Sequence, residues 1–516
     1  MPNGAYALIR TMVDAGITTC FTNPGTSEIH LVAALDAVPE MRAVLTLFEG
    51  VATGAADGYA RMADAPGATL LHLGPGLGNG LANLHNARRA KVPILNIVGD
   101  HATYHAQYDS PLQSDIETVA RNVSTWVRTS SKTELLARDV IDAITVASGP
   151  PGQIATLIVP ADVSWKDGAE PATAGSPVVR SAAPAEDIEV VARALRGGGR
   201  TGILLGGEAL REAGLMAAAR IAAATGTKLL AERSAPRLER GAGLPAVERL
   251  EYWPELASSQ LDGLDHLILA DAKPPVSWFA YPGKPSFLVS DGCEVHEFSP
   301  GTDVLSNLDA LVEAADAAEV SPALQPAGVP PRPDGPLTAE KACQAIGAIL
   351  PEGAIISDEA ITSAAALPAN TAGAPRHDWL TLTGGAIGQG LPVAVGAAIA
   401  CPDRPVIALE ADGSALYTIQ SLWTMAREQL DITVVIFNNR AYRILGAELA
   451  RLDRQVPGSR AKALIDLGHP DLDFVQLGTG LGVASRRVDT AEQLIDALEA
   501  AIAEPGPHLI EAILGH

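Results

Sequence analysis

The stretch from Glu410 to Leu445 constrains the fold of this chain more than any other. The apolar run 406–409 leads into a small-residue turn, 411–414, and a second apolar run, 432–437, ends in Asn438-Asn439. Between the two runs, apolar residues recur near helical spacing at Leu416, Ile419, Leu422, Trp423 and Ala426. The pattern predicts a strand, a helix and a second, parallel strand. Because such crossovers are almost always right-handed, the carboxyl ends of both strands should meet at one edge of a sheet.

Polar groups at that edge predict a site for a cation and a phosphate. Asp412 and Asn439 follow the two strands, and a carboxylate with an amide oxygen suits Mg²⁺ or Ca²⁺. Gly413 and Ser414 would present backbone N–H groups at a helix start, where phosphate is favoured. The combined interpretation is a divalent ion that holds a diphosphate. The alternative is an ordinary strand–helix–strand unit whose turns contain an Asp and an Asn.

The 516 residues are too many for one hydrophobic core, and three domains are expected, over residues 1–165, 183–325 and 335–516. Strand-like apolar runs alternate with helix-like segments along the chain. In the middle domain the runs 201–205, 228–231, 266–269 and 287–289 predict strands. We therefore expect an α/β protein with three doubly wound parallel sheets, and ligands at the carboxyl ends of the strands.

Charge, hydropathy and cysteine usage exclude several classes of function. The net charge of −23 argues against a nucleic-acid partner, which requires a cationic surface. The sequence contains no run of about twenty apolar residues, so no membrane span is expected. The four cysteines are scattered and lack metal-binding spacing, and the amino-terminal residues do not resemble a signal segment. The resulting expectation is a cytoplasmic protein.

Two residues of the first domain are candidates for proton transfer. Glu49 sits where a predicted strand becomes an Ala/Gly-rich helix, and burial there would raise the pKa of its carboxyl group. Such an acid suits proton donation to a heterocyclic nitrogen, although a glutamate at a helix start is also simply favoured by the helix dipole. His72 ends another strand, before a Gly-rich stretch, 74–79, that we expect to form a turn open to a ligand. A lone histidine is more often structural than catalytic.

Four motifs together resemble the thiamine-diphosphate-dependent 2-oxo acid enzymes, the family of benzoylformate decarboxylase and the acetolactate synthase large subunits. The 411–439 stretch resembles their Gly-Asp-Gly…Asn-Asn motif, with Ala411 in place of the first glycine. Phe48-Glu49-Gly50 resembles the motif on the pyrimidine side of the cofactor. Leu71-His72 and the glycines after it resemble a stretch with a catalytic histidine. Asn23-Pro24-Gly25-Thr26 resembles a loop with an active-site serine, where Thr26 takes the serine position.

The resemblance implies a role for each matching residue. The catalytic residues would be Glu49, His72 and Thr26. The metal ligands would be Asp412, Asn439 and the carbonyl of Ala441. The cofactor would contact Asn23, Pro24, Gly25, Asn79, Ile361, Thr362, Gly385, Ile387, Gly413, Ser414, Tyr442 and Ile444, with Ile387 as a wedge under its two rings. Leu112, Leu445 and Glu448 would face the substrate.

The resemblance also implies an activity and an assembly. The expected reaction is C–C bond cleavage of a small-molecule 2-oxo acid with thiamine diphosphate and Mg²⁺ (or Ca²⁺), by decarboxylation with or without carboligation. An acetolactate-synthase-type carboligase and a silent cofactor-binding subunit are the alternatives. FAD, which acetolactate synthases carry in the middle domain, is not expected, because the Gly206-Gly207 fingerprint is incomplete. The cofactor would lie between subunits of a homodimer at least, or of a homotetramer. Benzoylformate decarboxylase has a second catalytic histidine, and Ala280 or Phe279 stands at that position in this chain.

Overall fold

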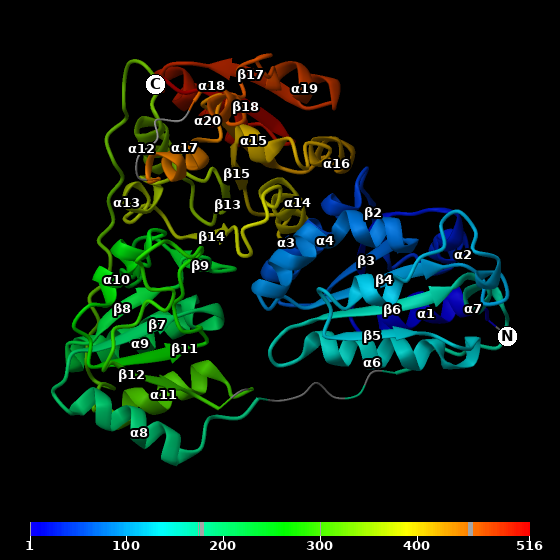
Figure 1. The fold of residues 1–516 in the computed structure, drawn as a ribbon, viewed down its shortest axis with the longest axis horizontal. Coiled ribbons are helices and arrows are strands. Elements are labelled where there is room, and N and C mark those ends of the chain that lie inside the picture. The colour runs from blue at the N-terminus through cyan, green and yellow to red at the C-terminus, as the bar shows by residue number, and fades with distance from the viewer. Residues whose placement is uncertain (1, 174, 176–179, 300, 453–457, 516) are drawn as a thin grey trace. The chain divides into compact units, whose positions relative to one another are not determined.

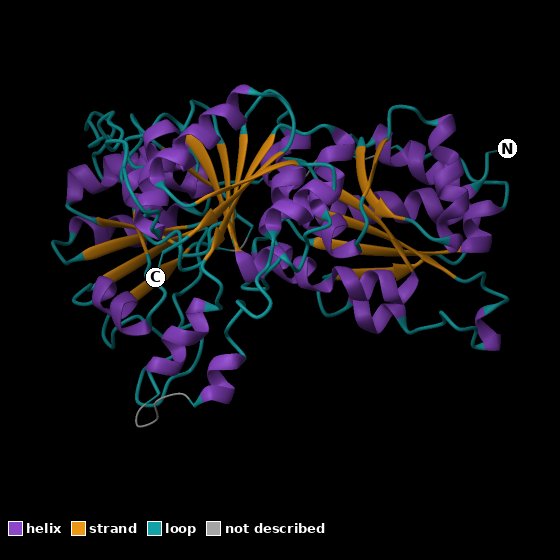
Figure 2. Ribbon diagram, turned by 90° about the horizontal axis from the view of Figure 1, so that it is seen from above, coloured by secondary structure: helices purple, strands orange, loops and turns teal. Residues whose placement is uncertain are grey.

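The computed structural model of the chain describes residues 2–515, apart from 174, 176–179, 300 and 453–457. The chain divides into two compact units (Figure 1). The first contains residues 1–177, 329–371 and 380–516, and the second contains residues 178–328 and 372–379. The first unit holds the predicted first and third domains, each built around its own sheet. Figure 2 shows the strands between layers of helices, which confirms the expected α/β class.

The first sheet has six parallel strands in the order β2-β1-β3-β4-β6-β5. Its strands are β1 (Thr19–Asn23), β2 (Arg42–Leu45), β3 (Gly67–His72), β4 (Ile94–Asp100), β5 (Trp126–Thr129) and β6 (Ile154–Pro160). Its helices are α1 (Gly4–Asp14), α2 (Ile29–Ala34), α3 (Glu49–Ala63), α4 (Leu73–Arg89), α5 (Ile116–Ala120), α6 (Leu136–Ser148) and α7 (Ala161–Trp165). Helices cover both faces of the sheet, so the residues that alternate along a strand are buried on opposite sides. In β4, Leu95 and Ile97 pack with α1 and α6, whereas Ile94 and Val98 pack with α3 and α4.

The third predicted domain surrounds a sheet with the strand order β17-β18-β16-β15-β13-β14-β9. The strands are β9 (Leu238–Arg240), β13 (Ile355–Glu359), β14 (His377–Thr381), β15 (Val406–Ala411), β16 (Ile432–Asn438), β17 (Ala484–Val488) and β18 (His508–Ile513). The helices are α12 (Ala339–Ile349), α13 (Leu367–Asn370), α14 (Gly390–Ala400), α15 (Asp412–Ala415), α16 (Ser421–Glu428), α17 (Arg443–Ala450), α18 (Ser459–Ala463), α19 (Phe474–Gly480) and α20 (Ala491–Ala503). Strands β15 and β16 are parallel neighbours, as the sequence predicted. The helix between them begins later than expected, because residues 412–415 form the separate turn α15.

The second unit contains a parallel sheet with the order β10-β8-β7-β11-β12. Its elements are α8 (Ala185–Arg196), β7 (Thr201–Leu205), α9 (Glu212–Thr225), β8 (Lys228–Ala231), β10 (Glu248–Arg249), α10 (Pro254–Leu261), β11 (His266–Ala270), β12 (Glu294–Glu297) and α11 (Val304–Ala314). The strand predicted at 287–289 is wrong, since Phe287 makes only an isolated bridge with Val276. The strand that pairs with β11 at the edge of the sheet is β12. Its sequence Glu-Val-His-Glu has no apolar run, because an edge strand is only partly buried.

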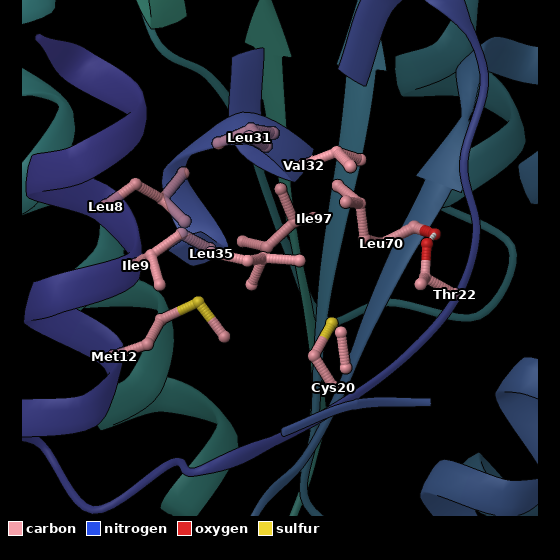
Figure 3. A pocket seen from close by; sticks show the side chains of 11 residues that line it. Leu8, Ile9, Met12, Cys20, Thr22, Leu31, Val32, Leu35, Leu70 and Ile97 are labelled. Carbon is pink, nitrogen blue, oxygen red and sulfur yellow. Dashed lines mark hydrogen bonds between the residues drawn. The ribbon is translucent and has the colours of Figure 1, made fainter. Parts of the chain in front are cut away.

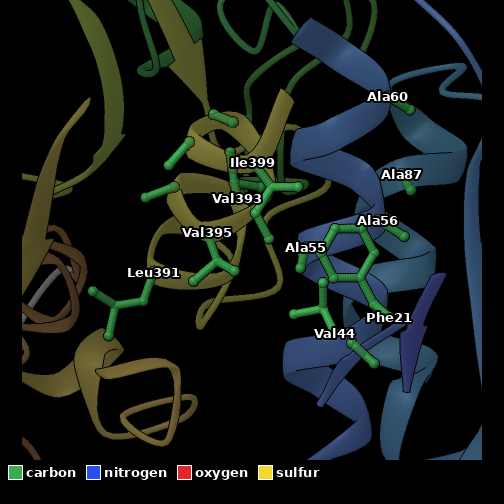
Figure 4. Packing of buried hydrophobic residues seen from close by; sticks show 14 of the residues in the cluster. Phe21, Val44, Ala55, Ala56, Ala60, Ala87, Leu391, Val393, Val395 and Ile399 are labelled. Atoms are coloured by element: carbon green, nitrogen blue, oxygen red, sulfur yellow. The ribbon is translucent and has the colours of Figure 1, made fainter. Parts of the chain in front are cut away.

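Helix α3 and helix α14 pack closely and join the cores of the first unit (Figure 4). Glycines permit this approach: a Cβ atom on Gly58 would lie 2.1 Å from the carbonyl oxygen of Val393, and one on Gly396 would lie 1.9 Å from that of Ala55. Arg61 of α3 adds a buried ion pair with Asp57, at 2.6 Å. Arg61 also donates from Nη1 to the carbonyl of Thr381 at 3.0 Å, so small residues and one buried cation join the first and third domains.

A small apolar cavity lies beneath the first sheet, between α1, α2 and the strands (Figure 3). Leu8, Met12, Leu31 and Ile97 line it, and its one hydroxyl, Thr22 Oγ1, donates to the carbonyl of Leu70 at 2.9 Å. The cavity is a packing gap without catalytic groups. None of the helices in the described part of the chain combines the length and apolarity that a membrane span requires.

Candidate active site

Glu49 begins helix α3, directly after the extended residue Phe48. Its side chain is buried, with 7% of the residue surface exposed. Asn79 Nδ2 donates to Glu49 Oε2 at 2.9 Å, and Asn23 Nδ2 donates to Oε1 at 3.4 Å. A Cβ atom on Gly76 would lie 3.3 Å from Oε1, so a side chain there would press on the carboxylate. The structure thus brings together Asn23, Glu49 and Asn79, three of the predicted site residues.

His72 ends strand β3 and is held by a buried carboxylate that the sequence did not reveal. Glu28, which is fully buried, places Oε2 2.8 Å from His72 Nδ1. A carboxylate only accepts hydrogen bonds, so Nδ1 carries a proton in this pair, and Nε2 is the other ring nitrogen. Gly25 N also donates to Glu28 Oε2, and a Cβ atom on Gly25 would lie 2.3 Å from His72 Nδ1. The pair is a carboxylate-oriented imidazole.

The hydroxyl next to His72 belongs to Ser27 rather than to the predicted Thr26. Ser27 Oγ lies 2.5 Å from Glu28 Oε1 and 3.1 Å from His72 Nδ1, whereas the Thr26 side chain is exposed. Residues 25–28 form a short helical turn, η1 (Thr26–Glu28), with the capping-box spacing of a glutamate three positions after its first residue. That spacing was the sequence signal for Glu28, but it is common at helix starts.

The predicted metal ligands also converge. Asp412 Oδ2 accepts hydrogen bonds from the backbone N–H groups of Asn439 at 3.1 Å and Arg440 at 2.6 Å, and Oδ1 accepts from Gly413 at 2.8 Å. Asn439 Oδ1 accepts from Ala441 N at 3.0 Å. Burial raises the pKa of the Asp412 carboxyl group. A carboxylate, an amide oxygen and the Ala441 carbonyl form a hard donor set that fits Mg²⁺ or Ca²⁺.

Three residues at the strand ends hold strained backbone conformations. Leu73 follows β3 with φ +54°, Ile361 follows β13 with φ +51°, and Arg440 follows β16 with φ +55°. Non-glycine residues rarely adopt this left-handed region, and a β-branched isoleucine is the least suited to it. Such strain persists only where the surrounding structure imposes it, typically at ligand sites. The three positions adjoin His72, the predicted anchor Thr362 and the predicted metal ligand Asn439.

The turn that contains Ile387 is fixed from two sides. Glu359, at the end of β13, accepts hydrogen bonds from Gly388 N at 2.7 Å and Gly390 N at 2.6 Å. From helix α4, Asn86 exchanges two hydrogen bonds with Ala386, at 2.7 Å and 3.1 Å. These contacts hold the backbone on both sides of Ile387, so the predicted wedge residue has a fixed position.

A single amide connects this turn to the Glu49 region. Asn83 Nδ2 donates to the carbonyl of Gly50 at 2.8 Å and to that of Gly388 at 3.2 Å. The residue after Glu49 and the residue after Ile387 are therefore neighbours within one chain. The first and third domains of one chain therefore contact each other here, and the cofactor's place between two subunits stays a prediction.

Two family models match the chain, one over the first domain and one over the third. The thiamine pyrophosphate enzyme N-terminal TPP binding domain matches residues 2–121, and the C-terminal TPP binding domain matches residues 363–512. The chain is 58% identical over 513 residues to a Mycobacterium tuberculosis protein that carries the provisional name acetolactate synthase large subunit IlvX, with 99% of each chain covered. The chain belongs to the thiamine pyrophosphate enzyme family. It is therefore a thiamine-diphosphate-dependent enzyme, which confirms the resemblance.

More distant relatives include decarboxylases of the same family. The chain is 29% identical to benzoylformate decarboxylase of Pseudomonas aeruginosa, over 99% of this chain and 98% of that protein. The structure of the thiamine-diphosphate-dependent 4-hydroxybenzoylformate decarboxylase of Rhodococcus jostii superposes with a TM-score of 0.85 at 26% identity, over 100% and 99% of the two chains. Both matches cover the whole chain, so the thiamine pyrophosphate enzyme architecture extends through the middle domain.

Beneath the predicted cofactor site of this thiamine pyrophosphate enzyme lies a pair of buried acids that the sequence did not indicate. Glu359 and Glu410 stand opposite each other on the parallel strands β13 and β15, and both are buried. Desolvation raises the pKa of Glu359 to about 7 and that of Glu410 well above its usual range, because two adjacent carboxyl groups cannot both ionise cheaply in an apolar environment. Glu359 already accepts two backbone N–H groups, so Glu410 is the member that holds the proton.

The remaining predicted residues occupy mixed environments. The Tyr442 ring packs on Gly413, where a Cβ atom would lie 2.3 Å from Cε1, and Ser414 is buried. Leu112 and Leu445 are exposed, and Ile444 and Glu448 are half-buried on α17. The role of Ile444 toward the cofactor, and those of the other three toward the substrate, remain predictions. The Gly-rich stretch 74–79 is not a turn, since helix α4 begins at Leu73 and runs through it. Gly74 and Gly76 instead permit close packing, against Ser114 and Glu49.

The middle domain offers carboxylates where a dinucleotide would need cations or free N–H groups. A Cβ atom on Gly207 would lie 1.8 Å from Asp271 Oδ2, and one on Gly206 would lie 2.8 Å from Glu232 Oε2. Asp271 also accepts from Glu208 N at 3.2 Å. Two acids at the carboxyl ends of β7, β8 and β11 disfavour an anionic diphosphate there.

Proposed function

We propose that this thiamine-diphosphate-dependent enzyme cleaves the C–C bond next to the carboxylate of a 2-oxo acid, with Mg²⁺ as the metal, in a benzoylformate-decarboxylase-like reaction. The observation that carries this proposal is the Glu28–His72 pair, at 2.8 Å. Like Glu49, both residues follow or end strands of the first sheet, at the carboxyl ends of those strands. A decarboxylation needs a proton at the carbon that has lost CO₂, and an oriented imidazole is suited to deliver it. The outcome is an aldehyde, or an acyloin where a second carbonyl compound is present.

The residues that would hold the cofactor fit its charges. Asp412, Asn439 and the Ala441 carbonyl would bind Mg²⁺, and the turn of Gly413 and Ser414 would face the diphosphate. When bound, the cofactor supplies an electron sink for the pair released by the broken C–C bond. Glu49 would exchange a proton with a ring nitrogen of its pyrimidine, while Asn23 and Asn79 hold the carboxylate in place.

His72 would handle the second proton transfer at the substrate. Its Nδ1–H is fixed by Glu28, so Nε2 is the atom that can accept or donate a proton. Thr26, exposed at the start of η1, would contact the substrate carboxylate. The second histidine of benzoylformate decarboxylase has no counterpart at Ala280 or Phe279, so His72 would serve both directions of proton transfer.

An acetolactate-synthase-type carboligase is the second candidate, and the 58% identity to IlvX favours it. The carboxylates of Glu232 and Asp271 argue against the FAD that such synthases carry. A silent cofactor-binding subunit is the third candidate. It would not need Glu49, Asp412 and Asn439 in hydrogen-bonded positions, and this chain keeps all three.

A screen of 2-oxo acids tests the proposal. The purified chain is incubated with thiamine diphosphate, Mg²⁺ and each acid, and CO₂, aldehyde and acyloin are followed together. We expect CO₂ and an aldehyde from at least one acid, and none from the Glu49→Gln variant. Acetolactate from pyruvate as the main product, or a flavin spectrum of the purified protein, would favour the synthase. Turnover of no 2-oxo acid would contradict both.

The assembly is proposed from the family. We infer a homodimer at least, with a homotetramer as the alternative, because the relatives share the whole architecture. Light scattering on the cofactor-bound protein distinguishes the two and would refute both if it returned the monomer mass of 53.3 kDa.

A further inference from the structure

Two histidines and a glutamate meet on one face of the sheet in the second unit. His266 lies on β11, and Glu294 and His296 lie on the neighbouring edge strand β12. In the parallel register His266 stands opposite Glu294, and Ile268 stands opposite His296. Since residues two apart on a strand share a face, the three side chains project to the same side. No part of the proposed reaction uses them.

Their donor atoms have the spacing of a metal site. His266 Nδ1 lies 3.1 Å from His296 Nε2 and 3.6 Å from Glu294 Oε2, and all three atoms lie within 4.8 Å of one another. Ligands about 2.1 Å from a tetrahedral zinc ion are about 3.4 Å apart. The two shortest separations lie on either side of that value, so small side-chain rotations would complete three ligand positions.

We propose that His266, Glu294 and His296 form a second metal site, which binds a transition-metal dication of the Zn²⁺ type and clamps the edge strand β12 to β11. Two imidazoles and one carboxylate are ligands that zinc accepts, whereas Mg²⁺ prefers oxygen donors. The site therefore differs in chemistry from the Asp412 site and would bind a different ion. The fourth position would hold water.

The environment of each ligand agrees with this assignment. His296 is buried, so it would hold the ion on the side of the site that faces the protein interior. Glu294 is on the open side, with 64% of its side chain exposed, so an ion can enter from solvent. Cys293, directly before β12, packs with Val295 against the apolar cluster of the domain and is not one of the three ligands.

The competing explanation is a hydrogen bond between two neutral imidazoles. One ring would donate to the other across 3.1 Å, and Glu294 would then be an ordinary exposed acid. The two explanations differ in what Glu294 does. A ligand carboxylate affects metal affinity, whereas an exposed bystander does not.

Equilibrium dialysis of the full chain against Zn²⁺ tests the proposal, with thiamine diphosphate and excess Mg²⁺ present to fill the Asp412 site. The protein carries no affinity tag, and Co²⁺ is used in parallel because its visible absorption reports the coordination geometry. We expect one Zn²⁺ per chain, a tetrahedral Co²⁺ spectrum, and a rise in the unfolding temperature of the chelator-treated protein when Zn²⁺ is added.

The variants are Glu294→Gln and His266→Ala, neither of which removes a buried side chain. Glu294→Gln should weaken Zn²⁺ binding at least about tenfold, and His266→Ala should abolish the Co²⁺ spectrum. His469→Ala is the matched control, since His469 is an exposed histidine 3.2 Å from a single carboxylate, that of Asp466. Zn²⁺ binding that is absent, or that stays the same in Glu294→Gln and His266→Ala, would overturn the proposal and leave the hydrogen-bonded pair.

Discussion

Replacing Glu28 with glutamine should remove the negative charge beside His72 while the orientation of the His72 ring is kept. Glu28 Oε2 accepts from His72 Nδ1 and Gly25 N, both at 2.8 Å. A glutamine carbonyl oxygen can take the same two bonds, and its amide can donate to Ser27 Oγ, which is able to accept. The geometry is therefore retained, and the negative charge is lost.

The magnitude follows from that lost charge. A unit charge pair at 2.8 Å interacts by about 6 kcal/mol at an effective dielectric constant of about 20, which is a ceiling for the stabilisation of a protonated His72. His72 has 23% of its side chain exposed, so solvent screens part of this energy. We expect kcat to fall about 10²-fold, equivalent to about 2.7 kcal/mol, with little change in KM. Stability should fall by about 1–3 kcal/mol, because hydrogen bonds to a charged group become neutral ones.

The assay is CO₂ release with the best 2-oxo acid from the screen, combined with denaturant unfolding. Asp139→Asn is the matched control, since Asp139 is a buried carboxylate of the same domain that bonds to Arg128 and Ser130, away from the predicted site. It should lose stability but keep kcat. In the double variant with His72→Ala, Glu28→Gln should add no further loss, because both act through one group. A kcat of Glu28→Gln within threefold of the parent enzyme, or full additivity with His72→Ala, would refute the orientation argument.

Three further predictions concern the other carboxylates. Glu49→Gln should lower kcat by about 10²- to 10⁴-fold without unfolding the chain, and a near-unchanged rate would rule out Glu49 as the activating acid. Asp412→Asn should weaken thiamine diphosphate binding in Mg²⁺ by on the order of tenfold or more, as measured by tryptophan fluorescence titration, and an unchanged affinity would remove Asp412 from the metal site. The raised pKa of Glu410 means that the folded chain keeps a proton which the unfolded chain releases above the ordinary carboxyl pKa. Stability from this proton is full at acid pH and falls as pH rises through the raised pKa. Glu410→Gln, which has no such proton, should therefore gain stability relative to the parent by at least about 1 kcal/mol between about pH 5 and pH 8. A pH-independent difference would contradict the assignment of the proton to Glu410.

The convergence of Asp412 and Asn439 could be predicted because it depends only on local rules. Two apolar runs with one helix between them form adjacent parallel strands, and the residues after them meet. The same reasoning predicted the strand end at His72. Buried parallel strands read as apolar runs because both of their faces are covered, whereas the half-exposed strand β12 could not be found in this way.

Long-range partners could not be predicted from the sequence. Glu359 faces Glu410 only because β13 lies beside β15, and the sequence of neither strand indicates which strand is its neighbour in the sheet. Glu28 has the spacing of an ordinary cap, and its partner His72 is 44 residues away. The glycines of 74–79 show the same limit. A Cβ atom on Gly74 would lie 2.1 Å from Ser114 Oγ, so its small size serves packing, and a sequence pattern does not distinguish packing from a turn.

Contacts between the first and third domains explain why the two ends of the cofactor site should act together. Asn83 joins the backbone after Glu49 to the backbone after Ile387, and Asn86 fixes the same turn through Ala386. Gln389, two residues after Ile387, donates to the buried carboxylate of Asp57 at 2.7 Å. A shift of the turn would therefore break hydrogen bonds of buried groups, each of which is expensive to leave unsatisfied. The backbone on both sides of the predicted wedge residue Ile387 is thus held against the first domain of the same chain.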